Sequence, residues 1–324
     1  MSESDPEPTE PSDPSEPSRS SDGSLLGSSS RGRWLVLARV AFLAAALGFG
    51  WLWLRDDWPD VVAAMGTVGP GAWVLAVVAV LTGLVSTGFV WARCLRRLGH
   101  EVPLHPSLSV FFVGQLGKYI PGSVWSLGAQ AQMAGRYGVP ARTTVVAGLV
   151  FLGWNLVTAG FVACVGVLAG LIGSSVPAWL VVLGLLVSVV AMTPPFVNAA
   201  GSWAAGDGRR LALTWVDCAT VVAMLLVTWT FYGLALVAVS PAPIDSAYGA
   251  AAAMVAFTAA YAVGVVVILA PAGLGAREAV LTLLLTPYLG VAGAVAAALL
   301  TRVVHTVADF AIAGAAWLLG RSRS

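Results

Sequence analysis

Long apolar runs with very few charges dominate this sequence and constrain its fold more than any other feature. A membrane-spanning helix needs roughly 20 mostly apolar residues. Six runs meet that requirement, at residues 34–54, 71–92, 143–171, 177–197, 211–239 and 291–319. Only 10% of the residues are charged, against about 25% in a soluble domain. The chain cannot cover a soluble core with polar surface, which excludes a cytosolic enzyme, a secreted disulfide scaffold and a disordered regulator. We expect an all-α polytopic membrane protein with about six full spans.

The first 30 residues differ in composition from the rest of the chain. They hold seven of the sixteen acidic residues and one Arg, and are otherwise mostly Ser and Pro. Low hydrophobicity combined with excess charge does not offset the entropy lost on ordering. We therefore expect residues 1–30 to form a disordered acidic tail and residues 31–324 to form one integral membrane domain.

Basic residues predict the orientation, because short cytoplasmic loops of membrane proteins are enriched in Arg and Lys. Loops 172–176 and 240–246 carry no basic residue. The basic residues that flank the expected spans are Arg31, Arg33, Arg93, Arg96, Arg97, Arg136, Arg142, Arg209, Arg210, Arg321 and Arg323. All of these clusters fall on one side if both termini are cytoplasmic. We expect a multi-pass plasma-membrane protein in that orientation.

Two further segments are apolar but broken. Residues 106–134 contain the only lysine of the chain, Lys118, and residues 247–289 are interrupted by Pro and Gly before Arg277 and Glu278. The charge pattern fits if the first segment enters from the cytoplasm and returns there, and the second does the same from outside. Each would be a re-entrant hairpin of two half-helices that meet at a Pro-Gly break. The alternative for the second segment is that residues 247–269 span fully.

The two breaks resemble each other in sequence. Pro121-Gly122 interrupts the first segment and Pro271-Ala272-Gly273 the second, and each is followed by a Gly-Val pair before a long span. Two similar hairpins entering from opposite sides would form an inverted-topology repeat, which places substrate sites near the midplane. The alternative is chance, because Gly, Ala and Val are abundant in this chain.

The breaks carry the residues that we expect to bind a ligand. A half-helix that starts at a break presents unpaired N–H groups and a partial positive charge, which favour an anion. Lys118 and Arg277 lie beside the two expected N-termini, and Glu278 would balance a charge, take a proton or hold Arg277. Charged residues within apolar segments are functional by default. The alternative is that Lys118 and Arg277 extend to an interface and that the Pro-Gly pairs merely end helices.

The last expected span carries three more ionisable residues, Arg302, His305 and Asp309. Spacings of three and seven residues place them on one helical face. Charges at that depth are costly, so they should pair with each other or with the hairpins. A proton relay or headgroup contact and a structural salt bridge to the second hairpin are both open. His305 titrates near neutral pH when unperturbed.

Several kinds of chemistry have no signal in the sequence. The three cysteines, Cys94, Cys164 and Cys218, have no metal-ligand or pairing spacing. No nucleotide-binding, hydrolase or metalloprotease motif is present. We expect no cofactor, no metal and no nucleic-acid partner.

Two motifs resemble those of the lysylphosphatidylglycerol synthase transmembrane region, also called flippase-like domain proteins. The first covers residues 114–124 with 135–139, and the second covers residues 271–278. In that family the second motif usually reads Pro-Gly-Gly-x-Gly-x-Arg-Glu, and Ala272 replaces its first Gly. The resemblance adds Tyr119 to the candidates, and Ser123 is a candidate because it lies in the first turn after the Pro121-Gly122 break. The headgroup-binding residues expected in all are Lys118, Tyr119, Pro121, Gly122, Ser123, Gly273, Gly275, Arg277 and Glu278.

The resemblance implies a multi-span domain that moves or holds lipids. In the best-known members of the family a separate soluble domain performs aminoacyl transfer, and we expect that domain to be absent here. Our leading hypothesis is a non-enzymatic lipid translocase or lipid-binding transporter for an anionic-headgroup or polyprenyl-phosphate-linked lipid of cell-envelope biogenesis. The alternatives are a membrane partner subunit of a glycosyltransferase and a membrane enzyme acting on a lipid-linked glycan.

Overall fold

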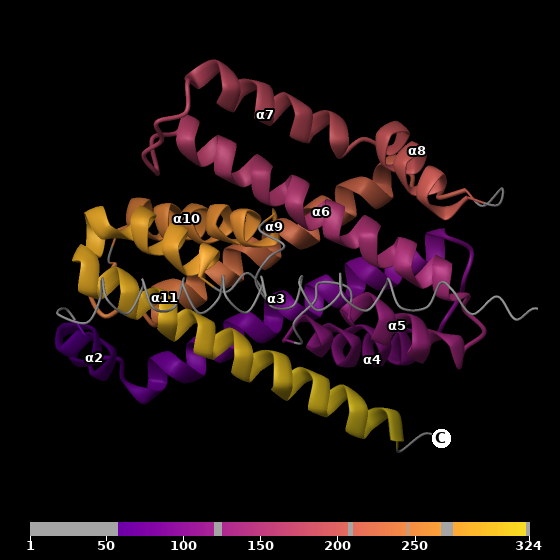
Figure 1. Ribbon diagram of the computed structural model, residues 1–324, viewed down its shortest axis with the longest axis horizontal. Helices are drawn as coiled ribbons and strands as arrows, with labels where there is room; N and C mark the ends of the chain where they lie inside the picture. The colour runs from indigo at the N-terminus through magenta and orange to yellow at the C-terminus, as the bar shows by residue number, and fades with distance from the viewer. Residues whose placement is uncertain (1–57, 120–124, 207–209, 245, 267–274, 322–324) are drawn as a thin grey trace, which may run out of the picture. The chain divides into compact units, whose positions relative to one another are not determined.

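The described part of the chain is helical throughout. The computed structural model describes residues 58–119, 125–206, 210–244, 246–266 and 275–321, which belong to one compact unit (Figure 1). Within these residues every regular element is a helix. In chain order they are α2 (Trp58–Gly66), α3 (Pro70–Arg97), α4 (Leu104–Gln115), η1 (Leu116–Tyr119), α5 (Trp125–Gly135), α6 (Ala141–Leu168), α7 (Ala178–Ala191), α8 (Pro194–Ala205), α9 (Trp215–Ala238), α10 (Ala247–Val266) and α11 (Ala276–Arg321). The expected all-α fold is confirmed.

Five helices are long and apolar enough to cross a membrane, and the count rises to 6 if one bent pair is a single span. The five are α3, α6, α9, α10 and α11. Helices α3, α6 and α9 coincide with the expected spans 71–92, 143–171 and 211–239, and the second part of α11 coincides with 291–319. The expected span 34–54 and the acidic tail lie outside the described residues.

The expected span over 177–197 is not one straight helix. It divides into α7 and α8, which meet at an angle of 71°. Pro194 and Pro195 open α8, and proline lacks the N–H group that would continue the hydrogen-bond ladder of α7. The residue before a proline is also driven out of the helical region, and Thr193 is extended, with ψ of 146°. The bend therefore follows from the Pro-Pro pair. The expectation of one continuous span did not take this pair into account.

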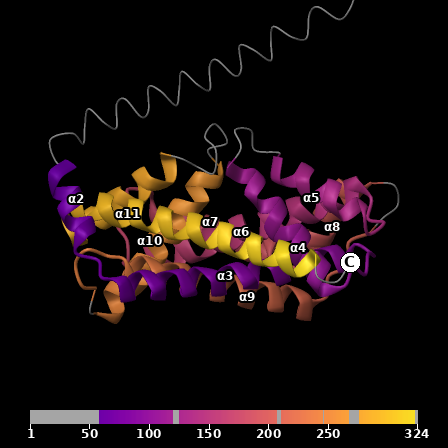
Figure 2. The same ribbon diagram turned by 90° about the horizontal axis from the view of Figure 1, so that it is seen from below.

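Helices α3 and α9 run antiparallel and lie side by side along one edge of the described unit in Figure 2. The Ser86 hydroxyl donates to the Met224 carbonyl at 2.8 Å, and the Thr228 hydroxyl donates to the Gly83 carbonyl at 3.2 Å. Gly83 is required by packing, because a Cβ there would lie 2.5 Å from the ring of Tyr232. Close helix approach through small residues and hydroxyls is the usual way in which membrane helices associate.

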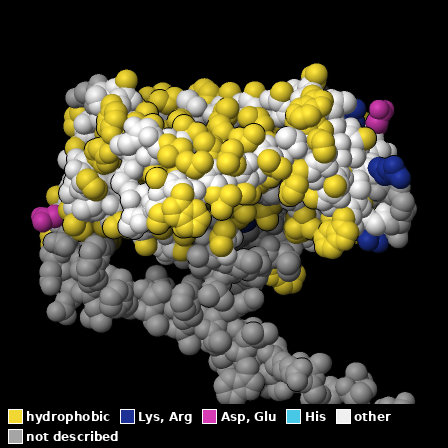
Figure 3. All heavy atoms as spheres, turned by 90° about the horizontal axis from the view of Figure 1, so that it is seen from above, with side chains coloured by type: hydrophobic (Ala, Val, Ile, Leu, Met, Phe, Trp, Pro, Cys, Tyr) yellow, Lys and Arg dark blue, Asp and Glu magenta, His cyan; other side chains and the backbone are white. Residues whose placement is uncertain are grey.

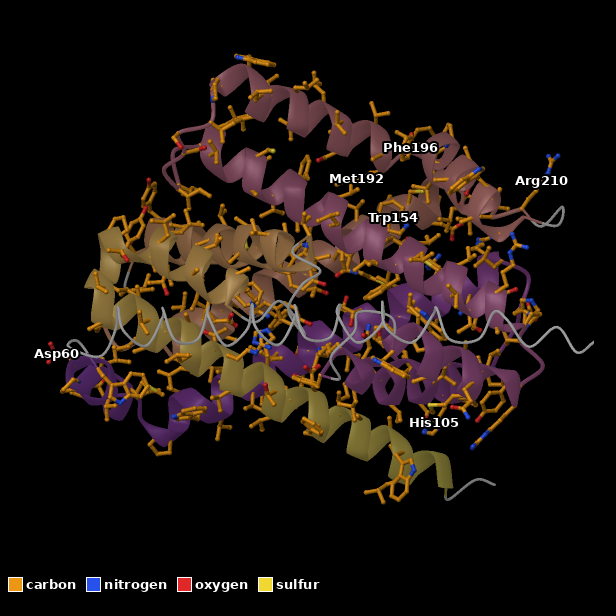
Figure 4. The ribbon with its side chains drawn as sticks, viewed as in Figure 1. Asp60, His105, Trp154, Met192, Phe196 and Arg210 are labelled. Atoms are coloured by element: carbon orange, nitrogen blue, oxygen red, sulfur yellow. The ribbon has the colours of Figure 1, made fainter. Side chains whose placement is uncertain are left out.

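Charge divides the two ends of this unit. The end formed by the C-terminus of α3 and the N-termini of α6 and α9, called the basic end below, carries Arg96, Arg97, Arg136, Arg142 and Arg210. The opposite end is formed by α2, the turn before α3, and loops 169–177 and 239–244. It contains Asp60 and no Lys or Arg among its described residues. Figure 3 shows Lys and Arg side chains at one end of an otherwise largely apolar face, and Figure 4 shows Asp60 and Arg210 at opposite ends. Every described loop agrees with the expected charge asymmetry.

The first broken segment forms a hairpin that begins and ends at the basic end. Helices α4 and α5 pack against each other and are joined through η1. The backbones approach closely, since a Cβ on Gly114 of α4 would lie 3.2 Å from the Gln130 nitrogen of α5, and one on Gly117 of η1 would lie 2.6 Å from the Ser126 nitrogen. With 12 and 11 residues at a rise of about 1.5 Å each, neither helix is long enough to cross a bilayer alone.

The second broken segment forms a hairpin from the opposite end. It consists of α10 and the first part of α11, up to Gly290, where a φ of 67° interrupts the helix. Both outer ends of this hairpin touch the C-terminal turn of α6. The Tyr248 hydroxyl donates to the Gly170 carbonyl at 2.6 Å, and the Tyr288 hydroxyl donates to the Leu171 carbonyl at 3.0 Å.

The two hairpins therefore enter from opposite ends of the unit (Figure 1). Helix α10 has 20 residues and is itself long enough to span. A re-entrant hairpin and a full crossing by α10 differ only in depth, because both return the chain to the end from which it came. Opposite entry is what an inverted repeat requires, and the repeat itself stays a prediction.

Candidate functional site

One face of α11 carries the charged residues that the sequence singled out. Arg302, His305 and Asp309 share this face with Thr306, as their spacing predicts. The face is turned inward, since His305 is 8% exposed and Asp309 is 6% exposed. The segment between Gly290 and Leu319 is centred near His305, so these residues lie near the middle of the expected last span.

The first hairpin contacts this face through Lys118 and Tyr119. The Lys118 ammonium forms an ion pair with Asp309 Oδ2 at 2.6 Å, and the Tyr119 hydroxyl donates to the same oxygen at 2.6 Å. The Tyr119 ring also stacks on Phe310 with centroids 5.5 Å apart. The alternative that Lys118 extends to an interface is not what the structure shows, because its ammonium is held by a buried carboxylate.

The second hairpin contacts the same face through Glu278. Its Oε1 accepts from the Arg302 guanidinium at 2.9 Å, and its Oε2 accepts from the Gly275 N–H at 2.7 Å. Glu278 thus caps the N-terminus of its own helix, which satisfies one of the unpaired N–H groups there. Gly275 has a φ of 87°, in the left-handed region that glycine adopts without strain. Of the alternatives for the last span, the salt bridge to the second hairpin is present, between Arg302 and Glu278.

Arg277 differs from the other two cations of the site. Its guanidinium carbon lies 4.5 Å from the centroid of the Phe257 ring, a cation–π contact. Among the described residues it forms no ion pair, and breaks 120–124 and 267–274 contain no Asp or Glu in their sequence. Gly264 on α10 admits Arg277, because a Cβ there would lie 3.0 Å from Arg277 Cβ.

His305 lies on the same aromatic ring as Arg277. Its imidazole stacks on Phe257 with centroids 5.1 Å apart and meets the edge of Tyr232 at 4.8 Å. Nδ1 lies 2.8 Å from the Thr301 carbonyl, which only accepts, so Nδ1 carries a proton. Nε2 is buried and has no hydrogen-bond partner among the described residues.

The structure brings most of the expected site residues together. Lys118, Tyr119, Gly275, Arg277 and Glu278 from the two hairpins gather along the face of α11 that holds Arg302, His305 and Asp309. Four expected residues, Pro121, Gly122, Ser123 and Gly273, lie outside the described residues. Sequence reasoning missed Phe257, Tyr232 and Thr306. Nothing in their spacing distinguishes them from apolar or hydroxyl residues that merely pack.

The charges of this site do not cancel. Three cations, Lys118, Arg277 and Arg302, stand against two carboxylates, Glu278 and Asp309. Each carboxylate is engaged by one cation, which leaves Arg277 as the cation without a carboxylate partner among the described residues. An unpaired guanidinium at this depth is costly unless an anion joins it. With a neutral His305, the described site carries one net positive charge.

These features define a class of protein: a polytopic helical membrane protein whose two opposed hairpins meet at a charged site in its interior. The chain matches the family described as lysylphosphatidylglycerol synthase TM region over residues 36–313, and it belongs to that family. The family is a membrane domain linked to lipid modification or lipid flipping. No curated protein matches the chain.

Proposed function

We propose that this chain is a lipid translocase or lipid-binding transporter for a lipid with an anionic headgroup. The lipid is a glycerophospholipid or a polyprenyl-phosphate-linked lipid of cell-envelope biogenesis. The observation that carries the proposal is Arg277, a cation of the second hairpin that contacts Phe257 and has no described carboxylate partner. Arg277 is suited to a phosphate, because a guanidinium donates two parallel hydrogen bonds to such a group.

The state of the two carboxylates supports transport without a chemical step by this chain. A general base needs a carboxylate free to accept a proton from the reacting group. Glu278 is occupied by Arg302 and the Gly275 N–H, and Asp309 is occupied by Lys118 and Tyr119. We assign these carboxylates the role of holding the hairpins against α11.

The charge asymmetry supports a location in the plasma membrane with both termini cytoplasmic. The basic end would face the cytoplasm, since Arg and Lys accumulate in cytoplasmic loops. The first hairpin would then enter from the cytoplasm and the second from outside, so that headgroups from either side would reach the same site.

Transbilayer movement of lipid in proteoliposomes tests this proposal. The purified full chain is reconstituted with a fluorescent phosphatidylglycerol, and the fraction accessible to an external quencher is followed with time. We expect the wild type to accelerate movement of this lipid over a fluorescent phosphatidylcholine. Arg277→Gln should slow the movement roughly tenfold, the cost of one charge-assisted hydrogen-bonded contact.

Arg210→Gln is the matched control, because it removes an exposed Arg at the basic end that lies outside both family motifs. Its rate should equal that of the wild type. Equal rates for the two lipids, or an unchanged rate in Arg277→Gln, would contradict the proposal.

A further inference from the structure

Helix α8 carries no charged residue although it leads to the basic end. Its 12 residues include no Asp, Glu, Lys or Arg. One side of the helix, called the outer face below, consists of four exposed residues at the spacing i, i+3, i+4 and i+7. They are Phe196, Ala199, Ala200 and Trp203. Phe196 is 52% exposed and Trp203 is 86% exposed. A helix in contact with water carries polar residues on its outward side, so the outer face requires an apolar partner.

Side chains of α8 hold the helix on the segment that leads into α9. The Asn198 amide donates to the Leu213 carbonyl at 2.9 Å and accepts from the Leu213 N–H at 2.8 Å. The Ser202 hydroxyl accepts from the Leu211 N–H at 3.0 Å. Backbone groups outside helices are thus satisfied by protein, as a low-water environment requires. These bonds also fix the rotation of α8, so the outer face is directed away from the protein.

The lengths of α7 and α8 place the outer face near a boundary of the bilayer. At a rise of about 1.5 Å per residue, the 14 residues of α7 extend roughly 21 Å, which is less than a hydrocarbon core of about 30 Å. Because α8 is bent by 71° from α7, it adds only about 6 Å along the direction of α7. A straight continuation would add about 18 Å and would carry Trp203 beyond the core. The bend therefore keeps α8 oblique, in the part of the core next to the headgroups.

The order of exposed side chains along α7 and α8 agrees with this depth. Helix α7 packs on α6, and Figure 1 shows α7 on the outside of the described unit. Trp179, near the start of α7, is 66% exposed, and Trp203 lies near the end of α8. The exposed side chains between them on α7 are aliphatic and include Leu183, Leu186, Val187 and Val190. Tryptophan is enriched at both membrane–water boundaries because the indole is apolar with one polar N–H, and aliphatic residues lie between the boundaries.

From these observations we infer that α8 is an interfacial helix whose outer face docks on the lipid leaflet at the basic end. Acyl chains cover Phe196 and the two alanines, and the Trp203 indole lies at the level of the headgroups. The occupant is the surface of the leaflet, in place of a second copy of this chain or a partner protein. Its docking fixes the depth of the basic end in the bilayer. The inference involves no residue of the charged site, so it holds or fails independently of the proposed function.

Depth-dependent fluorescence quenching tests this placement. The purified full chain, with its three native cysteines replaced by alanine, carries one fluorophore on Trp203→Cys and is reconstituted in proteoliposomes. The quenchers are lipids brominated near the headgroup, lipids brominated near the chain ends, and iodide on both sides of the membrane. Two exposed positions serve as matched controls. Leu186→Cys on α7 reports the hydrocarbon centre, and Glu101→Cys in the loop between α3 and α4 reports water at the basic end.

We expect bromines near the headgroup to quench the label at position 203 most strongly, and iodide to quench it far less than the label at position 101. The label at position 203 should lie roughly 10–15 Å nearer the headgroups than the label at position 186. Iodide quenching equal to that at position 101 would show that α8 lies in water, free for a partner protein, and would overturn the inference. A depth equal to that of position 186 would overturn it as well. Protection from all three quenchers would show that a second copy of the chain covers the outer face in place of lipid.

Discussion

Asp309 is the residue on which the contact between the first hairpin and α11 depends. Its carboxylate is 7% exposed and accepts from both the Lys118 ammonium and the Tyr119 hydroxyl. A buried carboxylate with two donors is stabilised by both, and removal of its charge leaves a cation without its counter-charge. Lys118 is 34% exposed, so part of that cost is screened.

Asp309→Asn should therefore destabilise the protein by about 1–3 kcal/mol, less than the loss of a fully buried pair. Lys118→Met in the same chain should recover part of that loss, because no unpaired ammonium remains. Thermal unfolding in detergent measures both, with Asp60→Asn as the control for an exposed carboxylate outside the site. If Asp309→Asn unfolds at the wild-type temperature, the ion pair contributes nothing to the fold.

Helices α6 and α10 approach each other through a single glycine. Gly166 and Gly170 lie four residues apart, a spacing of small residues that predicts close approach between membrane helices. The structure confirms this for Gly166, because a Cβ there would overlap the side chain of Val255 on α10. Gly170 does not pack against another helix, because a Cβ there would meet nothing within 4 Å. Gly170 instead has a φ of 72° and follows the end of α6, the usual position of a C-terminal capping glycine.

Gly166→Ala should lower stability by about 1–3 kcal/mol, the range for overpacking a well-packed contact. Gly153→Ala is the matched control in the same helix, since a Cβ there meets nothing within 4 Å. It should be neutral or stabilising, because alanine has the higher helix propensity. The two variants are compared by thermal unfolding in detergent, and equal effects at both positions would show that α6 and α10 do not pack as described.

Other polar residues inside the helices have partners within their own helix, on another helix, or both. Thr158 is hydrogen-bonded between helices, because the Trp229 indole N–H donates to its hydroxyl at 3.1 Å. Asn155 instead bonds within its own helix, to the Phe151 carbonyl at 2.8 Å. Asp217 caps α9 through Thr214 and pairs with Arg93 at 2.6 Å, which ties α9 to α3 at the basic end.

For the whole molecule, the arrangement of the two ends is the feature that carries function. Both hairpins return to the end from which they start, and those ends are opposite. The basic end carries the Arg residues, and the other end has none among its described residues. Under the proposed function, headgroups from both leaflets would reach a site that hairpins enter from both ends, as a lipid carrier requires.

Cysteine labelling in intact cells tests this orientation. In a chain with Cys94, Cys164 and Cys218 replaced, a single cysteine at Ser174 should react with an impermeant maleimide from outside. A single cysteine at Arg136 should react only after permeabilisation. Both positions are exposed, so accessibility depends on the side of the membrane. The reverse pattern would invert the proposed topology, and labelling of both positions from outside would contradict the separation of the two ends.

The sequence by itself determined the class of fold, the charge asymmetry and the short set of charged residues inside the membrane. Each of these follows from a local pattern. The length of the apolar runs predicts the spans, the positions of the Arg residues distinguish the two ends of the unit, and the spacing of the charged residues places them on one face of α11. The tertiary structure alone decided the partners. Tyr119 meets Asp309 across 190 residues of chain, and Arg277 and His305 share a ring, Phe257, that no motif marks. Such contacts depend on how separate helices pack, and a helical period carries no information about packing between helices distant in sequence. Packing therefore decided that Lys118 and Arg302 are paired with carboxylates, while Arg277 has no carboxylate partner among the described residues.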